Sequence, residues 1–309
     1  MRKKKLLGLG FIGALLIILA VVARFVFPLE LNDRLTSVAL WRGGVHRFHS
    51  GRLSGYVKDF CEPSDPEARG CTCVALIHGL GDEPETWKKV LLSPASEWKR
   101  PVRLYALDVP RATRFAPGDA PESYRVRAQA HEIAEGLKPL CPRFVVVGNS
   151  LGGWISAWVA IDHELPLEKL VLSGAAGLRG SVTGPDSAAD LFLDMNEQRV
   201  KEIQKRAYSH PHEWPEYIWK KLTQRMMGYH LEQVARAQVP DDLLDGRLQE
   251  IRVPTLVLWG GSDRIVPLPE GHHLQEAIPG SILKIIPDCG HVPQKECVQP
   301  YLRIINDFL

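Results

Sequence analysis

The chain has 309 residues, of which 45% are hydrophobic and 24% are charged, as is typical of a folded globular protein and not of a disordered or fibrous one. Its 38 basic and 36 acidic side chains nearly cancel, so the formal net charge is only +2. This balance argues against a nucleic acid partner, which would need a concentrated positive charge. The length is compatible with one large domain that contains an insertion, or with two small domains, so the number of domains is not determined by length alone.

The first predicted element is a membrane anchor at the N-terminus. Basic residues at positions 2–5 precede an uncharged, apolar stretch over residues 6–23. About 18 apolar residues can span a bilayer, whereas the apolar part of a signal peptide has about 7 to 15. We therefore interpret residues 1–28 as a retained anchor, with a cleaved signal as the alternative because Val21-Val22-Ala23 ends in a small residue. The basic residues should stay in the cytoplasm, which places the rest of the chain outside it, on the periplasmic side.

Beyond the anchor, short apolar runs indicate the strands of a sheet. Residues 29–60 predict one or two edge strands. Later runs alternate with segments of helical periodicity at residues 122–138, 150–163 and 294–309. This alternation predicts an α/β fold with a mostly parallel sheet that helices bury on both faces. The runs are VALIHG at 74, VRLYALDV at 102, FVVVGNS at 144, KLVLSGAAG at 169, TLVLWGGSD at 255 and ILKIIPDCG at 282.

One long gap interrupts this alternation. About 75 residues between the runs at 169 and 255 carry no strand signal and are rich in helix formers, whereas a plain connection would be far shorter. We expect a helical insertion over the sheet, the cap, at about residues 180–247.

The run FVVVGNSLGGW, residues 144–154, contains the first candidate catalytic residue. The motif Gly-x-Ser-x-Gly, formed by Gly148, Ser150 and Gly152, is weak alone, but here it follows a predicted buried strand and precedes a predicted helix. A serine in such an elbow has a strained backbone, and a Cβ two residues before or after it would clash. The dipole of the following helix favours negative charge at its N-terminus. We therefore expect Ser150 to be a nucleophile and not only a turn residue.

A serine hydroxyl attacks only when a base takes its proton and a carboxylate orients that base. Asp263 follows the strand LVLWG and His291 follows the next strand, in the chain order serine, acid, histidine. Both would project from the sheet edge that carries Ser150. Asp288 is a rival acid, but it lies three residues before His291 in the same loop and is poorly placed to orient the ring.

The remaining component is an oxyanion hole, which needs two backbone N–H groups aimed at the developing negative charge. Leu151, directly after the serine, supplies one of them. The turn HGLGD at 78–82 supplies the other, from Leu80, with His78 and Gly79 as supporting turn residues.

In combination these motifs resemble those of the α/β-hydrolases over residues 55–309. Gly-Asn-Ser-x-Gly-Gly with Gly-His-Val-Pro, together with the anchor, is most similar to secreted or membrane-anchored bacterial lipases related to monoacylglycerol lipases. The resemblance implies a hydrolase domain at 29–309, a lid between the sixth and seventh strands, and a serine esterase that needs no cofactor. The segments that carry it are His78-Gly79-Leu80-Gly81, Gly148-Asn149-Ser150-Leu151-Gly152-Gly153, Gly260-Gly261-Ser262-Asp263 and Gly290-His291-Val292-Pro293.

The chain departs from that family in one place. The run LDVPRATRFAPGD has Arg111-Ala112-Thr113 where the family usually has Asp-x-Pro-Gly-x-Gly. The usual shape of that active-site wall is therefore in doubt, whereas the triad is not affected.

The six cysteines are an even number, which suits disulfides in an oxidising compartment, although the residues alone permit 15 connectivities. The resemblance narrows the choice. In the family fold the strand with Cys73 lies beside the strand after Cys141, so these two could be bridged. The implied pairs are Cys61–Cys71, which closes a hairpin loop, Cys73–Cys141, and Cys289–Cys297, which pins the His291 loop to the last helix.

Two further groups of residues have a plainer interpretation. The histidine pairs at 46 and 49, 210 and 212, and 272 and 273 form no HExxH motif and lack a carboxylate at ligand spacing, so we predict no metal site. The cap carries large apolar residues that suit the acyl pocket of a low-polarity ester, although packing explains any single one equally well. They are Phe192, Met195, Trp214, Tyr217, Trp219, Met226, Met227 and Tyr229.

The sequence thus predicts a membrane-anchored serine hydrolase of carboxylic esters, such as monoacylglycerols or other acyl esters. The same triad serves carbon-carbon bond hydrolases, thioesterases and amidases, which a polar pocket lined by Arg111 and Arg114 would favour. A binding module that kept the fold without turnover is the alternative from another class.

Overall fold

The computed structural model describes residues 28–61, 70–110, 120–184 and 187–309. No helix within these ranges has both the length and the apolar character needed to cross a membrane. The predicted anchor falls almost entirely on residues 1–27, outside the described residues, as do Arg111-Ala112-Thr113 and Arg114.

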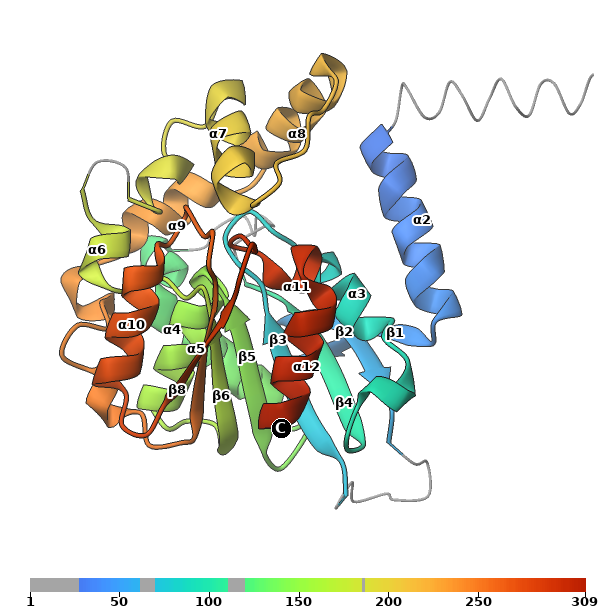
Figure 1. Ribbon diagram of the computed structural model, residues 1–309, viewed down its shortest axis with the longest axis vertical. Coiled ribbons are helices and arrows are strands. Elements are labelled where there is room, and N and C mark those ends of the chain that lie inside the picture. Colours follow the sequence, from blue (N-terminus) through green and yellow to red (C-terminus); the bar gives the residue numbers. More distant parts are fainter. Residues whose placement is uncertain (1–27, 62–69, 111–119, 185–186) are drawn as a thin grey trace, which may run out of the picture.

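An eight-stranded sheet in the order β1-β2-β4-β3-β5-β6-β7-β8 forms the centre of the described chain, as Figure 1 shows. Strand β2 pairs antiparallel with β1 and β4, and the other neighbouring pairs are parallel. The predicted α/β fold with a mostly parallel sheet is therefore confirmed. The strands are β1 (Val45–Ser50), β2 (Leu53–Asp59), β3 (Thr72–Ile77), β4 (Val102–Asp108), β5 (Phe144–Asn149), β6 (Leu167–Ser173), β7 (Thr255–Gly260) and β8 (Ile282–Ile286).

Helices cover both faces of the sheet and create two hydrophobic cores. Helices α4, α5 and α10 pack in one core, while α3 and α12 pack in the other. Successive side chains of a strand point to opposite faces, so Cys73 and Ala75 enter the first core and Val74 the second. The helices are α2 (Pro28–Arg42), α3 (Lys88–Leu91), α4 (Val126–Leu137), α5 (Leu151–Ile161), α6 (Arg179–Val182), α7 (Glu197–Ala207), α8 (Glu216–Met227), α9 (Leu231–Ala237), α10 (Leu268–Ala277), α11 (Pro293–Glu296) and α12 (Val298–Phe308).

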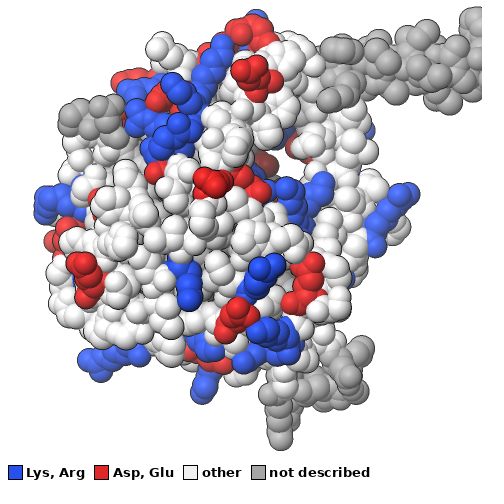
Figure 2. All heavy atoms as spheres, in the orientation of Figure 1, with Lys and Arg blue, Asp and Glu red and all other residues white. Residues whose placement is uncertain are grey.

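Helices α6 to α9 form the predicted insertion between β6 and β7. Figure 1 shows α7 and α8 standing over one end of the sheet, above the carboxyl ends of the parallel strands. On the face drawn in Figure 2, basic and acidic side chains of the described residues are interspersed, and no continuous basic area covers the sheet or the cap.

Two details of the secondary structure differ from the prediction. Residues 29–42, assigned to the edge-strand region, belong to helix α2, in which Thr36 and Leu40, one turn apart, are buried. The strands β1 and β2 begin only after Gly43 and Gly44. The final helix, predicted as continuous over 294–309, is split into α11 and α12, because Cys297 leaves the helical conformation with φ −120° and ψ 48°.

The structure contains the three disulfides that the family resemblance implied. Cys61 bonds to Cys71, Cys73 to Cys141 and Cys289 to Cys297. Cys73 and Cys141 are buried at the start of β3 and just before β5, which are neighbouring parallel strands. The break at Cys297 lies where its side chain reaches Cys289 in the His291 loop.

We expect the Cys73–Cys141 disulfide to contribute more stability than Cys61–Cys71, because their sequence separations are 68 and 10. Chain-entropy arguments give roughly 4 kcal/mol for the longer loop and roughly 3 kcal/mol for the shorter one. Urea unfolding of the two double Cys→Ala variants measures the difference, and an equal loss in both would contradict this ranking.

Candidate active site

Ser150 occupies a strained elbow between β5 and α5. Its backbone has φ 58° and ψ −120°, a conformation that costs a non-glycine residue of order 1–3 kcal/mol. Hydrogen bonds hold it from both sides. The Ser150 N–H donates to the Ser173 carbonyl over 3.0 Å, and the Ser150 carbonyl accepts from Trp154 (3.1 Å) and Ala176 (3.2 Å). The sheet and the first turn of α5 therefore fix the serine in this conformation.

Positions 148 and 152 of the motif must be glycine, because other backbone segments approach them too closely for a Cβ atom. A Cβ on Gly148 would lie 2.1 Å from the Gly152 carbonyl oxygen. A Cβ on Gly152 would lie 2.3 Å from the carbonyl oxygen of Ile77 and 2.6 Å from that of His78. The elbow thus packs against the end of β3, which brings the serine beside the turn at 78–82.

Asp263 and His291 meet at the same sheet edge, from the loops after β7 and β8. The Nδ1 atom of His291 lies 2.7 Å from Oδ2 of Asp263, and both residues are buried. Oδ1 of Asp263 accepts the N–H groups of Ile265 (2.9 Å) and Val266 (3.0 Å), which fixes the carboxylate. With Nδ1–H donating to the carboxylate, Nε2 of His291 is the nitrogen left to accept a proton.

The rival acid, Asp288, does not contact the His291 ring in this way. The Asp263–His291 pair packs closely against Gly174 (φ 50°). A Cβ at that position would be 3.1 Å from Oδ2 of Asp263 and 3.2 Å from Nδ1 of His291. The structure therefore pairs His291 with Asp263.

His78 shapes the turn that carries Leu80. Its fully buried ring accepts the Val109 N–H at Nε2 (3.0 Å), so Nδ1 bears the proton and donates to the Gly79 carbonyl oxygen (2.9 Å). In a trans peptide the C=O and the next N–H point in opposite directions, so the Leu80 N–H is directed away from His78. The Leu151 N–H, at the first position of α5, has no helical partner.

A buried amide network, which the sequence did not predict, links the serine elbow to the histidine loop. Asn149 donates from Nδ2 to the carbonyl oxygens of Ser173 (3.0 Å) and His291 (2.9 Å). The Gln294 side chain donates to Oδ1 of Asn149 over 3.0 Å. Asn149 lies next to the serine in the Gly-Asn-Ser motif, and that position was the available signal. The network couples the positions of Ser150 and His291.

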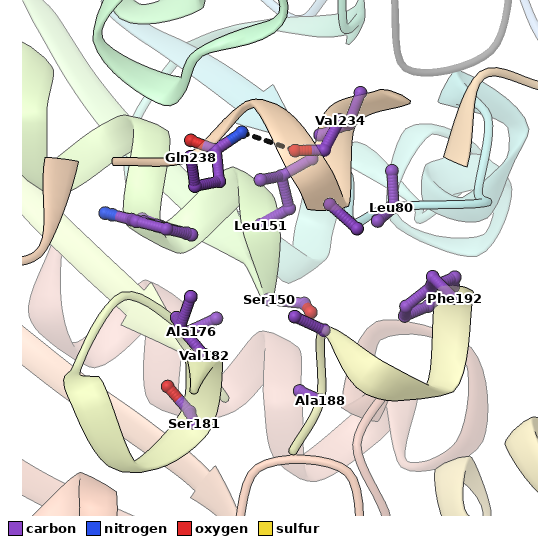
Figure 3. A pocket seen from close by; sticks show the side chains of 13 residues that line it. Leu80, Ser150, Leu151, Ala176, Ser181, Val182, Ala188, Phe192, Val234 and Gln238 are labelled. Carbon is purple, nitrogen blue, oxygen red and sulfur yellow. Dashed lines mark hydrogen bonds between the residues drawn. The ribbon is translucent and has the colours of Figure 1, made fainter. Parts of the chain in front are cut away.

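Two hollows meet at Ser150 and share Leu80 and Phe192. The first, which we name the apolar compartment, has about 420 Å³ of empty space when the open solvent at its mouth is included. Figure 3 shows Ser150 at its wall, between Leu151 and Ala188. Its other described lining residues are mostly small or aliphatic: Trp154, Ala176, Ser181, Val182, Ala189, Val234, Ala235 and Gln238.

The second hollow, the polar compartment, lies on the His291 side of Ser150 and has about 650 Å³ of empty space when the open solvent at its mouth is included. Asp82 and Lys295 line it as an ion pair, with Lys295 Nζ 3.0 and 3.1 Å from the two carboxylate oxygens. Burial is the largest single influence on the pKa of Asp82 and would raise it, but the charge of Lys295 and the other polar neighbours together lower the pKa below its usual value. Burial would lower the pKa of Lys295, whereas Asp82 raises it. Both groups are therefore charged at neutral pH.

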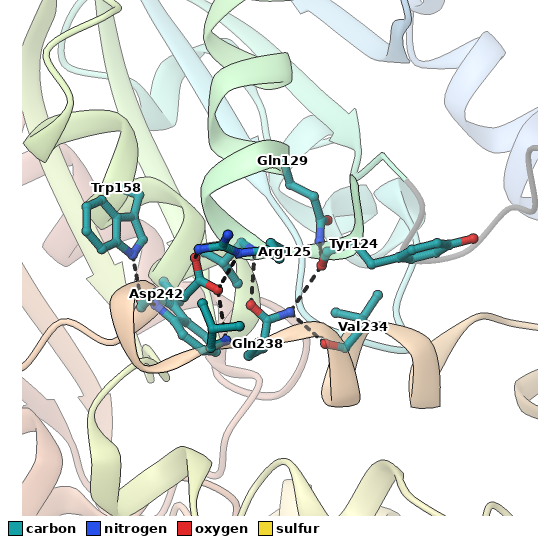
Figure 4. A network of polar contacts seen from close by, with 10 residues as sticks. Tyr124, Arg125, Gln129, Trp158, Val234, Gln238 and Asp242 are labelled. Atoms are coloured by element: carbon teal, nitrogen blue, oxygen red, sulfur yellow. Dashed lines mark hydrogen bonds and ion pairs between the residues drawn. The ribbon is translucent and has the colours of Figure 1, made fainter. Parts of the chain in front are cut away.

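A second polar network fixes the end of the cap to the body of the protein. Asp242 is fully buried and accepts two hydrogen bonds of 3.0 Å from Arg125, which precedes α4 (Figure 4). The hydrogen bond to Asp242 raises the pKa of Arg125. Gln238 accepts the Val126 N–H and donates to the carbonyls of Tyr124 and Val234. These contacts place α9 and Gln238 over the apolar compartment.

Only some of the large cap residues predicted to form an acyl pocket line the two compartments. Phe192 lines both compartments and Met226 lines the polar one. Trp214 and Met227 are exposed, and Trp219 is buried away from both compartments. Small residues provide most of the apolar lining instead. Alanine and valine occur throughout such a chain, so their presence in a pocket has no sequence signal.

Sequence comparison relates the chain to known hydrolases. A model described as "Alpha/beta hydrolase family" matches residues 74–303. The chain is 26% identical over 257 residues to a 2-hydroxy-6-oxononadienedioate/2-hydroxy-6-oxononatrienedioate hydrolase of Pseudomonas putida, covering 78% of this chain and 88% of that protein. It is 27% identical over 237 residues to Lipase 1 of Psychrobacter immobilis, covering 72% of each.

Solved structures share the fold. A membrane phospholipase A described as a bacterial virulence factor has a TM-score of 0.71 at 23% identity, covering 99% of this chain and 97% of that one. A putative lipase of Acinetobacter baumannii has a TM-score of 0.70 at 17% identity, covering 89% and 96%.

We expect Arg125→Met to lower the free energy of unfolding by about 3 kcal/mol, because it leaves the buried Asp242 carboxylate without its cation. The double variant Arg125→Met/Asp242→Asn should recover part of that loss, since its Asn side chain is uncharged. Urea unfolding of both single variants and the double variant measures the coupling. Additive losses would contradict the coupling of this pair.

Proposed function

The chain belongs to the alpha/beta hydrolase family, and we propose that it is a serine hydrolase that cleaves carboxylic esters through an acyl-enzyme intermediate. The observation that supports this most strongly is the strained Ser150 on the wall of a compartment that also contains His291, which is hydrogen-bonded to the buried Asp263. Strain at a serine is retained where the surrounding structure enforces it, and such positions concentrate at reactive sites.

The proposed reaction follows from these positions. Ser150 Oγ attacks the ester carbonyl while Nε2 of His291 takes its proton, and Asp263 holds the ring and stabilises the resulting imidazolium. The N–H groups of Leu80 and Leu151 donate to the oxyanion. His291 then returns the proton to the departing alcohol. His291 then takes a proton from a water molecule, which attacks the acyl carbonyl; the bond to Ser150 Oγ breaks as His291 returns that proton to it, and the carboxylic acid leaves.

The two compartments suggest how an ester binds. The apolar compartment suits the acyl chain, since its described lining residues bear no charge. The polar compartment suits the alcohol, because His291 protonates the leaving oxygen on that side. There the Asp82–Lys295 pair is neutral as a whole and offers donors and acceptors to hydroxyl groups. Monoacylglycerols and other acyl esters with a polar alcohol are therefore the proposed substrates.

Carbon-carbon bond hydrolysis is the second candidate, which the relation to the Pseudomonas putida hydrolase supports. A dienedioate carries two carboxylates, and one of them would have to lie near Lys295. If the protein hydrolysed a dienedioate faster than any ester, carbon-carbon bond hydrolysis would become the better supported function. A binding module without turnover would instead leave Ser150 unreactive.

A series of p-nitrophenyl esters of increasing chain length tests the proposal. Hydrolysis should peak at a chain length set by the apolar compartment, and Ser150→Ala should lower kcat by at least about 10⁴-fold because the nucleophile is lost. Labelling by a serine-directed phosphonate is the parallel measurement. If the folded wild-type protein hydrolyses none of the esters and is not labelled either, the serine hydrolase proposal is refuted.

We further propose that residues 1–28 retain the protein in a membrane with the hydrolase domain outside the cytoplasm. Support comes from the apolar run at 6–23 and from α2, which starts at Pro28 and exposes Leu35, Val38 and Trp41. The full chain should then need detergent for extraction, whereas a chain beginning at residue 28 should stay in the supernatant after a salt wash. A full chain that a salt wash alone releases would contradict the anchor.

A further inference from the structure

The C-terminal end of α7, in the cap, is bound directly to the two loops that carry the catalytic acid and histidine. The Ala207 carbonyl oxygen accepts the backbone N–H of His291 over 2.8 Å. Arg264, the residue after the acid, donates to the carbonyl oxygens of Lys205 (2.5 Å) and Tyr208 (2.9 Å). The last carbonyls of a helix have no partner within it, and here both catalytic loops supply their donors.

Glu296 closes the same junction from the other side. Its Oε1 atom accepts from the Ser209 N–H (3.0 Å), the Ser209 hydroxyl (2.5 Å) and the His210 N–H (3.2 Å). Its Oε2 atom accepts from the Gly290 N–H over 2.7 Å. One carboxylate therefore bonds the chain after α7 and the residue that precedes His291. Hydrogen bonds to a charged acceptor are roughly twice as strong as neutral ones.

The packing at this junction leaves no room for a side chain at Gly290. A Cβ there would lie 2.4 Å from the Ala207 carbonyl oxygen and 2.9 Å from both the Ser209 nitrogen and Oε2 of Glu296. The histidine loop is therefore in backbone contact with the end of α7. The Cys289–Cys297 disulfide closes the same loop around Glu296.

We propose that the α7 end of the cap is a fixed part of the catalytic scaffold, and that Glu296, supported by Arg264, is a positioning residue for His291. This inference rests on the proposed ester hydrolysis. A bond to the His291 backbone and another to its neighbour define where the ring lies, while Asp263 defines how the ring is turned. Any opening of the cap that admits substrate then leaves residues 205–210 in place, and the movement occurs in other cap elements.

The test compares kcat and KM of Glu296→Ala, Glu296→Gln and Arg264→Met on the best p-nitrophenyl ester. Glu296→Ala should lower kcat about 10- to 100-fold and change KM less than about 3-fold, because a catalytic group displaced by about 1 Å loses rate without losing the binding compartments. Glu296→Gln should recover part of the rate, since its amide oxygen can still accept from Ser209. The exposed Arg264 should contribute less, about 2- to 3-fold.

Glu202→Gln is the matched control, because Glu202 lies on α7 but pairs with Arg206 on the surface of the same helix. It should leave kcat unchanged. Circular dichroism verifies folding, and hydrogen exchange should show faster exchange at the 209, 210, 290 and 291 amides in Glu296→Ala.

A folded Glu296→Ala protein with wild-type kcat, or with a raised KM at unchanged kcat, would overturn the positioning role while leaving the ester hydrolase intact. A wild-type protein that hydrolyses no ester in the same assay would refute the proposed function itself, and the positioning role with it.

Discussion

The backbone strain at Ser150 is the constraint on which the rest of the site depends. A positive φ at a non-glycine residue persists only where its surroundings enforce it, and here the enforcement comes from β6, through Ser173, and from α5, through Trp154. The turn is tight enough that Gly152 lies against the end of β3. That approach brings the Leu80 turn, the Leu151 amide and the serine hydroxyl together before any substrate binds. The elbow therefore determines the positions of the proposed nucleophile and the predicted oxyanion hole as one unit.

The proposed base, His291, and the proposed acid, Asp263, belong to a second unit, built from the loops after β7 and β8. Register in a parallel sheet brings these loops to the edge where β5 ends, but it does not align side chains to hydrogen-bonding precision. Short polar contacts provide that alignment. Asn149 reaches from the elbow to the His291 carbonyl, and Glu296 ties the same loop to α7. The cap thus contributes to the geometry of the base as well as to the walls of the compartments.

The parts of this molecule that the sequence predicted are those with a local signal. The serine, the acid and the histidine each follow an apolar strand, and the disulfide pairs followed once the order of strands was implied by the family. Helix α2 had no such signal, since its buried positions, Pro28, Thr36 and Leu40, include a polar residue and form no regular apolar stripe. The Arg125–Asp242 and Asp82–Lys295 pairs join residues more than a hundred positions apart, and no pattern within either segment identifies its partner. These long-range ion pairs could therefore not be predicted from the sequence, although they help to shape both compartments.

Among the polar contacts that attach the cap to the rest of the described chain, three lie near the two compartments and limit how the cap can move. At the C-terminal end of the cap, Asp242 binds Arg125. Tyr229 donates to Glu83, beside the Leu80 turn, over 2.6 Å. The end of α7 binds the histidine loop. Burial and the bond to Glu83 raise the pKa of Tyr229, so its hydroxyl stays protonated and keeps donating. A rigid rotation of the whole cap would break all three attachments together. Local shifts of α6, or of residues 211–215 before α8, break none of them. Access to Ser150 by such local shifts would leave both catalytic units assembled while substrate enters.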